Sequence, residues 1–369
     1  MLKKLAIFVP LSILAAATVW VFAAGSANDP LVSLSYLTQV FTAAVEKEVD
    51  KRLGASDTQL INSLGNVKVE QPSTAPAASA ASNWTETRLK KGDILHGVTG
   101  TNVLLLAGSA QVLYDGGTVV DVSTGSVLES GAALEAKHRY LVAEDTVAVF
   151  TVTSKTAVID YQGPYTFAYS NNTDYNAMAA ALKSLHLFKG SFTGYGQGFD
   201  LELAPTRLQA LIMFIRVLGE EEAALAWKGT EPFEDIHEGT QAYNYVGYAY
   251  EKGYTNGYTA TEFRPAGAVN AWQYTEFMLR AMGYSSVANT NLAGTLTKAQ
   301  EVGMLTENEV AYLQKDAFLR AELVYISYYA LHTRLPDGVM TLATQLQAKG
   351  VFSPNEWTEA QKLVPGPRM

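Results

Sequence analysis

The chain has 369 residues, of which 48% are hydrophobic and 17% are charged, and this balance excludes a mostly disordered protein. A net charge of −9 argues against a general nucleic-acid-binding protein, because neutralising phosphates requires a basic surface. The absence of cysteine excludes disulfides, thiolate zinc sites and a cysteine nucleophile, and the length suffices for two or three domains.

Residues 1–27 have the organisation of an export signal. Two lysines precede an apolar run over residues 5–24, and small residues follow up to Ala27, where we expect cleavage. The alternative is an uncleaved membrane anchor, because the run approaches the roughly 20 residues that span a bilayer. Pro10 and the small residues favour the cleaved signal. In both cases the rest of the chain lies outside the cytoplasm.

Residues 28–69 are predicted to form an N-terminal helical segment, because apolar side chains recur there at spacings of three and four. These side chains are Leu34, Leu37, Phe41, Val45 and Val49. The run spans few heptads without a clean a/d seam, so packing on a neighbouring domain is favoured over oligomerisation. Residues 70–83 are rich in Pro, Ala and Ser, and this composition predicts a linker.

Residues 84–170 consist of short segments rich in Val, Thr and Tyr, separated by turn signals such as Gly163-Pro164. The predicted strands cover residues 103–106, 110–114, 118–122, 138–142, 146–152, 157–161 and 165–169. Seven or more short strands at this spacing predict an all-β sandwich or small barrel.

Catalytic and metal-binding patterns are absent from the sequence. Asp115, Asp121 and His138 lack a ligand spacing, so we interpret them as scattered loop residues and expect no metal and no cofactor. The histidines are isolated, and neither His-Glu-x-x-His nor Gly-x-Ser-x-Gly occurs. The chain is therefore predicted not to be an enzyme. A wall hydrolase with two carboxylates flanking a cleft is the less favoured alternative.

From residue 174 the pattern becomes helical, and three related tetrads each open a helix. They are Thr206-Arg207-Leu208-Gln209, Asn270-Ala271-Trp272-Gln273 and Leu319-Arg320-Ala321-Glu322, at offsets of 64 (270 − 206) and 49 (319 − 270) residues. A helix-loop-helix unit of this size cannot bury its apolar face alone, so we expect the copies to pack together. The predicted copies cover residues 174–230, 231–285 and 286–335, and a C-terminal helical cap covers residues 336–369.

The second copy carries the most specific pattern. It reads Phe233-Glu234-Asp235, then a Tyr-rich helix, then Gly253-Tyr254-Thr255-Asn256-Gly257, then Phe263-Arg264-Pro265 and a second helix. This order resembles the S-layer homology (SLH) module, whose family pattern runs Phe-x-Asp, helix, Gly-hydrophobic-x-Gly, Phe-x-Pro, Thr-Arg-Ala-Glu, helix. The resemblance covers about residues 174–333, and the third copy is degenerate. It implies an all-α domain of three repeats arranged as a pseudo-threefold prism, in a non-catalytic bacterial protein secreted to the cell wall or cell surface.

The resemblance also implies a ligand. In SLH proteins the grooves between repeats hold a pyruvylated secondary cell-wall polysaccharide, and the motif arginine meets the ketal carboxylate. A carboxylate suits this position, because an arginine at a helix start offers a planar fork beside the positive end of the helix dipole. Arg207 and Arg320 match the motif arginine, whereas Ala271 replaces it in the second copy.

The candidate residues for binding the wall polymer come from the tetrads and the Tyr-rich helix. They are Thr206, Arg207, Arg320, Glu322, Tyr245 and Tyr248. For the arginines, the alternative is a salt bridge at the helix start, with Glu202 or Glu322 as the partner. For the tyrosines, the alternative is packing between repeats, which is favoured although Tyr also suits stacking on sugar rings.

The expected partner is the secondary cell-wall polysaccharide or another peptidoglycan-linked polymer. Because the motif arginine is lost at Ala271, an SLH-derived protein-protein interaction or envelope scaffold module is the alternative, with other envelope proteins as partners. A membrane is a partner only if the N-terminal segment stays uncleaved.

Overall fold

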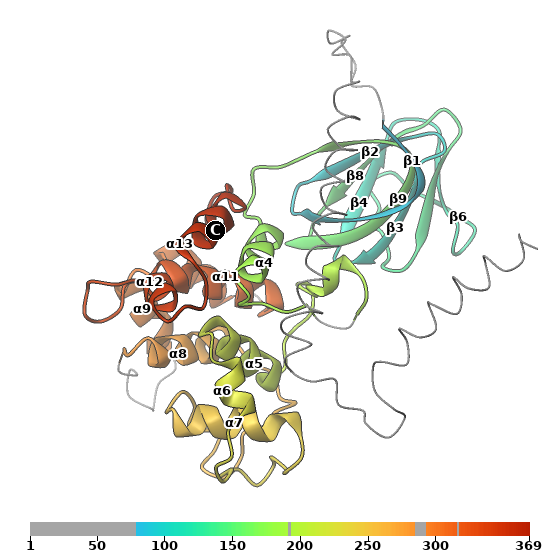
Figure 1. Ribbon diagram of the computed structural model, residues 1–369. Coiled ribbons are helices and arrows are strands. Elements are labelled where there is room, and N and C mark those ends of the chain that lie inside the picture. The colour runs from blue at the N-terminus through green and yellow to red at the C-terminus, as the bar shows by residue number, and fades with distance from the viewer. Residues whose placement is uncertain (1–78, 191–192, 285–292, 316) are drawn as a thin grey trace, which may run out of the picture. The chain divides into compact units, whose positions relative to one another are not determined.

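The computed structural model describes residues 79–369 except 191–192, 285–292 and 316. The predicted export signal and the predicted N-terminal helical segment therefore lie outside the described residues. An all-β part is followed by an all-α part, as predicted, and both belong to one compact unit, Pro76–Met369 (Figure 1). In the described part of the chain, no helix combines the length and the apolar character needed to cross a bilayer.

The β-strands are all paired antiparallel, in the order β4-β8-β2-β9-β3-β7-β5-β6, with β1 also paired to β9. Their bounds are β1 Ser79–Lys90, β2 Ile94–Val98, β3 Asn102–Ala107, β4 Ala110–Tyr114, β5 Thr118–Asp121, β6 Ser126–Leu128, β7 Arg139–Ala143, β8 Val147–Val152 and β9 Thr156–Ala168.

The segment after β6 returns to the opposite end of this strand order. The Leu134 N–H donates to the Ala110 carbonyl at 2.8 Å, and the Val112 N–H donates to the Ala132 carbonyl at 3.1 Å. The sheet curls around its own core, which contains Leu95, Val112 and Tyr140 among other buried side chains. This arrangement is of the sandwich or small-barrel type that the short strands predict.

Strand β9 differs from the prediction, because it runs without a break through the expected turn at Gly163-Pro164. Gly163 has φ 97°, and a Cβ added there would lie 2.5 Å from the Gly100 carbonyl oxygen. The glycine therefore serves as a bend within one strand that passes close to a neighbouring backbone. Strand β1 begins at Ser79, so the last residues of the predicted linker pair with β9.

The helices follow β9. Their bounds are α4 Tyr175–Ser184, the short 3₁₀ helix η2 Gly196–Gly198, α5 Arg207–Val217, α6 Glu221–Leu225, α7 Gln241–Glu251, α8 Ala271–Ala281, α9 Ala293–Glu301, α10 Glu307–Leu313, α11 Arg320–His332, α12 Leu342–Ala348 and α13 Pro354–Lys362. Helices α5, α8 and α11 each begin at the second residue of a tetrad, and we call them the motif helices. The predicted C-terminal cap contains two helices, of which α12 packs on α11 and α13 packs on α4.

The three copies pack on one another in a closed cycle, in which the first helix of each copy contacts the motif helix of the copy before it. Helix α7 of the second copy packs on α5 of the first, α9 of the third packs on α8 of the second, and α4 of the first packs on α11 of the third. The three motif helices also contact one another pairwise. Each copy thus buries its apolar face on its neighbours, which is why a single helix-loop-helix unit does not suffice.

The end of the first helix has the same hydrogen bond in all three copies. The amides of Leu187, Tyr254 and Met304 donate to the carbonyls of Leu182, Ala249 and Ala299, at 2.9, 2.8 and 2.9 Å. The residue before each amide has a positive φ, as helix C-termini commonly do. In the third copy Thr306 caps α10 in the stretch where the second copy has the loop with Phe263-Arg264-Pro265.

Candidate functional site

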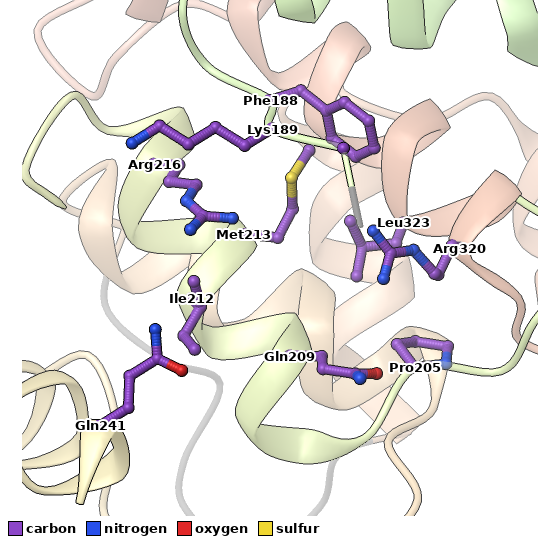
Figure 2. Close-up of a pocket in the computed structure, with 11 residues that line it drawn as sticks. Phe188, Lys189, Pro205, Gln209, Ile212, Met213, Arg216, Gln241, Arg320 and Leu323 are labelled. Carbon is purple, nitrogen blue, oxygen red and sulfur yellow. The ribbon is translucent and has the colours of Figure 1, made fainter. Parts of the chain in front are cut away.

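A cavity of about 200 Å³ lies between the motif helices α5 and α11, and we call it the first groove (Figure 2). It is lined by Phe188, Lys189, Gly190, Pro205, Gln209, Ile212, Met213, Arg216, Gln241, Arg320 and Leu323. Figure 2 shows Arg216 and Arg320 on opposite sides of Met213. Three cationic side chains and two amides therefore surround an apolar floor.

Two of these cations share one carboxylate. Lys189 Nζ lies 2.5 Å from Glu221 Oε2, and Arg216 Nε lies 2.7 Å from Glu221 Oε1. The Tyr245 hydroxyl donates to the same carboxylate at 2.8 Å. Although burial opposes ionisation, the hydrogen bonds from Lys189, Tyr245 and Arg216 lower the pKa of Glu221 to about 2. The charges of Lys189 and Arg216 are thus partly compensated within the protein.

Arg320 differs from these two cations. Its guanidinium lies 5.9 Å from the centre of the Phe188 ring, and no carboxylate of the described residues forms an ion pair with it. Within the described ranges its side chain also donates no hydrogen bond. Burial lowers the pKa of Arg320, while the nearby Asp200 and Glu202 oppose that effect. A half-buried guanidinium fork with unused donors, facing a cavity, is suited to a carboxylate or another planar anion.

The backbone around Arg320 is already satisfied. The Arg320 N–H donates to the Leu203 carbonyl at 2.8 Å, and the Ala321 N–H donates to the Leu201 carbonyl at 3.1 Å. The Arg207 N–H donates to the Gly267 carbonyl in the same way, at 2.8 Å. These first-turn N–H groups are therefore not open to a ligand, and an anion would be held by side chains.

We call the corresponding position of the second copy, at the start of α5 and on α8, the second groove, and there the side chain of Arg207 is enclosed by the protein itself. Arg207 is 4% exposed, donates from Nη2 to the Gly257 carbonyl at 3.1 Å, and lies 4.9 Å and 5.5 Å from the ring centres of Phe263 and Phe277. Burial lowers the pKa of Arg207 to about 10. No carboxylate of the described residues pairs with it, so the predicted salt bridge is not present there.

We call the corresponding position of the third copy, on α11 and at the start of α8, the third groove. It lacks the arginine, since Ala271 takes its place, and Glu322, which corresponds to Gln209 of the first groove (322 − 209 = 113), is 1% exposed. Glu322 Oε1 lies 2.5 Å from the ammonium of Lys155, a residue of the β part. The charge of Glu322 raises the pKa of Lys155 despite burial. The other acid named as a helix-start partner, Glu202, forms its ion pair with Arg88 at 2.5 Å.

The remaining predicted site residues have structural contacts. Thr206 caps α5, and its hydroxyl accepts from the Gln209 N–H at 3.2 Å. Tyr245 and Tyr248 are 1% and 7% exposed, and the Tyr248 hydroxyl donates to Glu220 at 3.0 Å. Their burial favours the packing interpretation over contacts with a sugar.

Lys189, Arg216 and Glu221 were missed as site residues by the sequence reasoning. Arg216 carries a usable signal, because a basic residue recurs 64 positions later as Arg280, also in the last turn of its motif helix. In the second copy that arginine is compensated locally, since Arg280 Nε lies 2.7 Å from Glu276 Oε1. The first groove is distinguished by the long-range approach of Arg320, which spacing alone does not reveal.

In the β part, the structure brings two of the three scattered polar residues together. His138 Nδ1 lies 2.7 Å from Asp121 Oδ2, whereas Asp115 forms no hydrogen bond or ion pair with either of these two described residues. In the described ranges no group of three or more His, Asp or Glu residues is placed to hold a metal ion. The pair joins the last residue of β5 to the residue before β7.

This pair predicts a pH dependence. The hydrogen bond with Asp121 raises the pKa of His138 above its ordinary value near 6.5. The folded state therefore favours protonated His138, and its contribution to stability is complete below pH about 6.5 and is lost as pH rises through the raised value. An NMR titration of the His138 ring should show the raised pKa, and Asp121→Asn should lower it. Identical His138 titrations in the two proteins would refute the coupling.

Comparison with known proteins identifies one family. The model of the S-layer homology domain matches residues 232–270, the segment that runs from before Phe233 to the start of α8. No curated protein matches the chain.

Among solved structures, the dTDP-6-deoxy-D-glucose-3,5-epimerase RmlC from Legionella pneumophila is 23% identical over 25% of this chain and 51% of its own, with a TM-score of 0.16. Pumpkin pro-11S globulin is 12% identical over 32% of this chain and 37% of its own, with a TM-score of 0.17. ToxT from Vibrio cholerae is 10% identical over 76% and 93%, with a TM-score of 0.11. The chain thus spans about half of the epimerase, and TM-scores this low say nothing about fold or function.

Proposed function

Because the chain contains an S-layer homology domain, we propose that it is a non-catalytic cell-surface protein whose first groove binds an anionic, pyruvylated cell-wall polysaccharide. Its localisation would be the wall or surface of a bacterium, reached through the export signal at residues 1–27. A peptidoglycan-linked polymer with other acidic substituents is chemically equivalent at this groove.

The observation that carries this proposal is the guanidinium of Arg320, which faces a cavity without a hydrogen-bond acceptor among the described residues. A ketal carboxylate would receive two parallel hydrogen bonds from the guanidinium fork. The neighbouring Phe188, Met213 and Leu323 would contact the apolar part of the substituent. The cavity is smaller than the 300–1,000 Å³ of typical small-molecule sites, so it would admit one substituent and leave the polymer backbone on the surface.

Binding to cell walls tests the proposal. The purified protein should co-sediment with native walls of a pyruvylating bacterium and should lose this binding when the pyruvyl groups are removed by mild acid. As a control, acid-treated walls are re-acetylated, which restores acetyl groups lost to the acid but not the pyruvyl groups, and these walls should also fail to bind the protein. Equal sedimentation with intact and pyruvate-free walls would contradict the proposed ligand.

A second candidate is an SLH-derived interaction or scaffold module that binds other envelope proteins. It is favoured by the self-occupied second and third grooves, where Arg207 is buried and Glu322 is paired with Lys155. If an Arg207→Ala plus Arg320→Ala variant keeps full wall retention, and cross-linking recovers an envelope protein, this candidate replaces polymer binding.

The hydrolase alternative has its own test. A zymogram on wall substrates should show no clearing, and clearing would support a hydrolase.

A further inference from the structure

The third groove contains a second feature that the wall-binding role does not use. Glu309 on α10 is fully buried, and its carboxylate receives two hydrogen bonds from Arg368 in the segment after α13. Arg368 Nε donates to Glu309 Oε1 and Arg368 Nη2 donates to Glu309 Oε2, both at 2.6 Å. This two-point contact is the geometry in which a guanidinium binds a carboxylate most specifically.

Further contacts enclose the guanidinium. Arg368 Nη2 also donates to the Met304 carbonyl at 2.9 Å, and the guanidinium carbon lies 3.8 Å from the centre of the Tyr329 ring. The Tyr325 hydroxyl donates to Glu309 and accepts from the Met369 N–H at 3.1 Å. Carboxylate, carbonyl and aromatic face together match the charge, the hydrogen-bond donors and the flat surface of a guanidinium.

The site occupies the position that the first groove has in the first copy. Tyr325 and Tyr329 lie 113 residues (319 − 206) after Ile212 and Arg216, which line the first groove. Met304 and Leu187 donate the same hydrogen bond at the ends of α9 and α4. Where the first groove has the cation Arg216 on its own helix, the third has Tyr329 and receives its cation from the segment after α13.

We propose that Glu309, Tyr325, Tyr329 and the Met304 carbonyl form a guanidinium-binding site, which is occupied by the chain's own Arg368 and latches residues 363–369 onto the third repeat. An ammonium lacks the planar fork that gives two parallel hydrogen bonds to the carboxylate, and it has no flat surface to cover the Tyr329 ring. The site is therefore selective for arginine over lysine. With Arg368 and Lys155 in place, the third groove is filled by the protein itself.

Chemical rescue tests the site without any wall polymer, so its failure is distinguishable from failure of the proposed function. The Arg368→Ala variant should melt at a lower temperature than the parent, and methylguanidinium should raise that temperature saturably. Methylammonium at equal ionic strength should not raise the melting temperature of this variant saturably. The parent protein and an Arg368→Ala plus Glu309→Gln variant should show no saturable rise with either cation.

A matched control is Arg264→Ala, which removes a guanidinium that lies 4.0 Å from the Tyr258 ring and 2.8 Å from Glu262 but is half exposed. Methylguanidinium should not rescue it. If Arg368→Ala does not fold, the melting temperature of Arg368→Lys replaces the rescue as the test: it should lie below that of the parent, because an ammonium cannot make the two parallel hydrogen bonds to Glu309, and an unchanged melting temperature would overturn the selectivity for arginine. Equal effects of the two cations, or rescue that persists without the Glu309 carboxylate, would overturn the proposal.

Discussion

Replacing Lys155 with alanine is expected to lower the free energy of unfolding by about 3 kcal/mol, because it leaves the buried carboxylate of Glu322 without its counter-charge. The two side chains are 17% and 1% exposed, so water cannot replace the lost ammonium at Glu322. The loss should be measured by urea unfolding, with the midpoint and the slope compared between variants.

The matched control for this prediction removes both charges. A Lys155→Met plus Glu322→Gln variant keeps most of the volume without a buried charge, and it should recover much of the lost stability. If Lys155→Ala alone costs less than about 1 kcal/mol, the pair behaves as a solvent-screened surface bridge, and the contact between the β part and the third repeat contributes little.

The Phe214→Ala substitution should destabilise the repeats by about 3–5 kcal/mol, the usual cost of removing a buried phenylalanine side chain. Phe214 on α5 is fully buried, and its ring centre lies 5.3 Å from that of Tyr254 and 5.7 Å from that of Phe277. Both neighbours belong to the second copy, so the loss should affect two copies together.

The control for Phe214 is Leu225→Ala, because the Leu225 side chain is 52% exposed and its truncation should change stability by less than about 0.5 kcal/mol. Thermal unfolding of Phe214→Ala should remain a single transition at a lower temperature. Separate melting of the first copy, with the second unchanged, would contradict the cyclic packing of the copies on one another.

The sequence predicts the repeat architecture well, because helix caps and apolar stripes are local. Thr206 and Asn270 both cap their motif helices through a glutamine three residues later. The β part was less predictable: β9 runs through a glycine-proline pair that normally signals a turn, since pairing with three other strands overrides the local preference.

The grooves show the limit of spacing arguments more clearly. Arg207 and Arg320 occupy the same motif position, yet one is enclosed by Phe263 and Phe277 while the other faces a cavity. The partners that fill the third groove, Lys155 and Arg368, come from segments far from the tetrads in the sequence. Such contacts depend on the closure of the whole fold and carry no periodic signal.

We propose that Arg320 in the first groove binds the anionic wall polymer. The most direct test compares the affinities of Arg320→Ala and of the parent protein for a purified pyruvylated polymer. Charge-assisted hydrogen bonds are worth about 1.5–3 kcal/mol, so the dissociation constant should rise about tenfold to a hundredfold at an unchanged melting temperature. Arg264→Ala, which removes a half-exposed arginine that does not line the cavity, should bind like the parent. An Arg320→Ala variant that binds the polymer as tightly as the parent would contradict the claim.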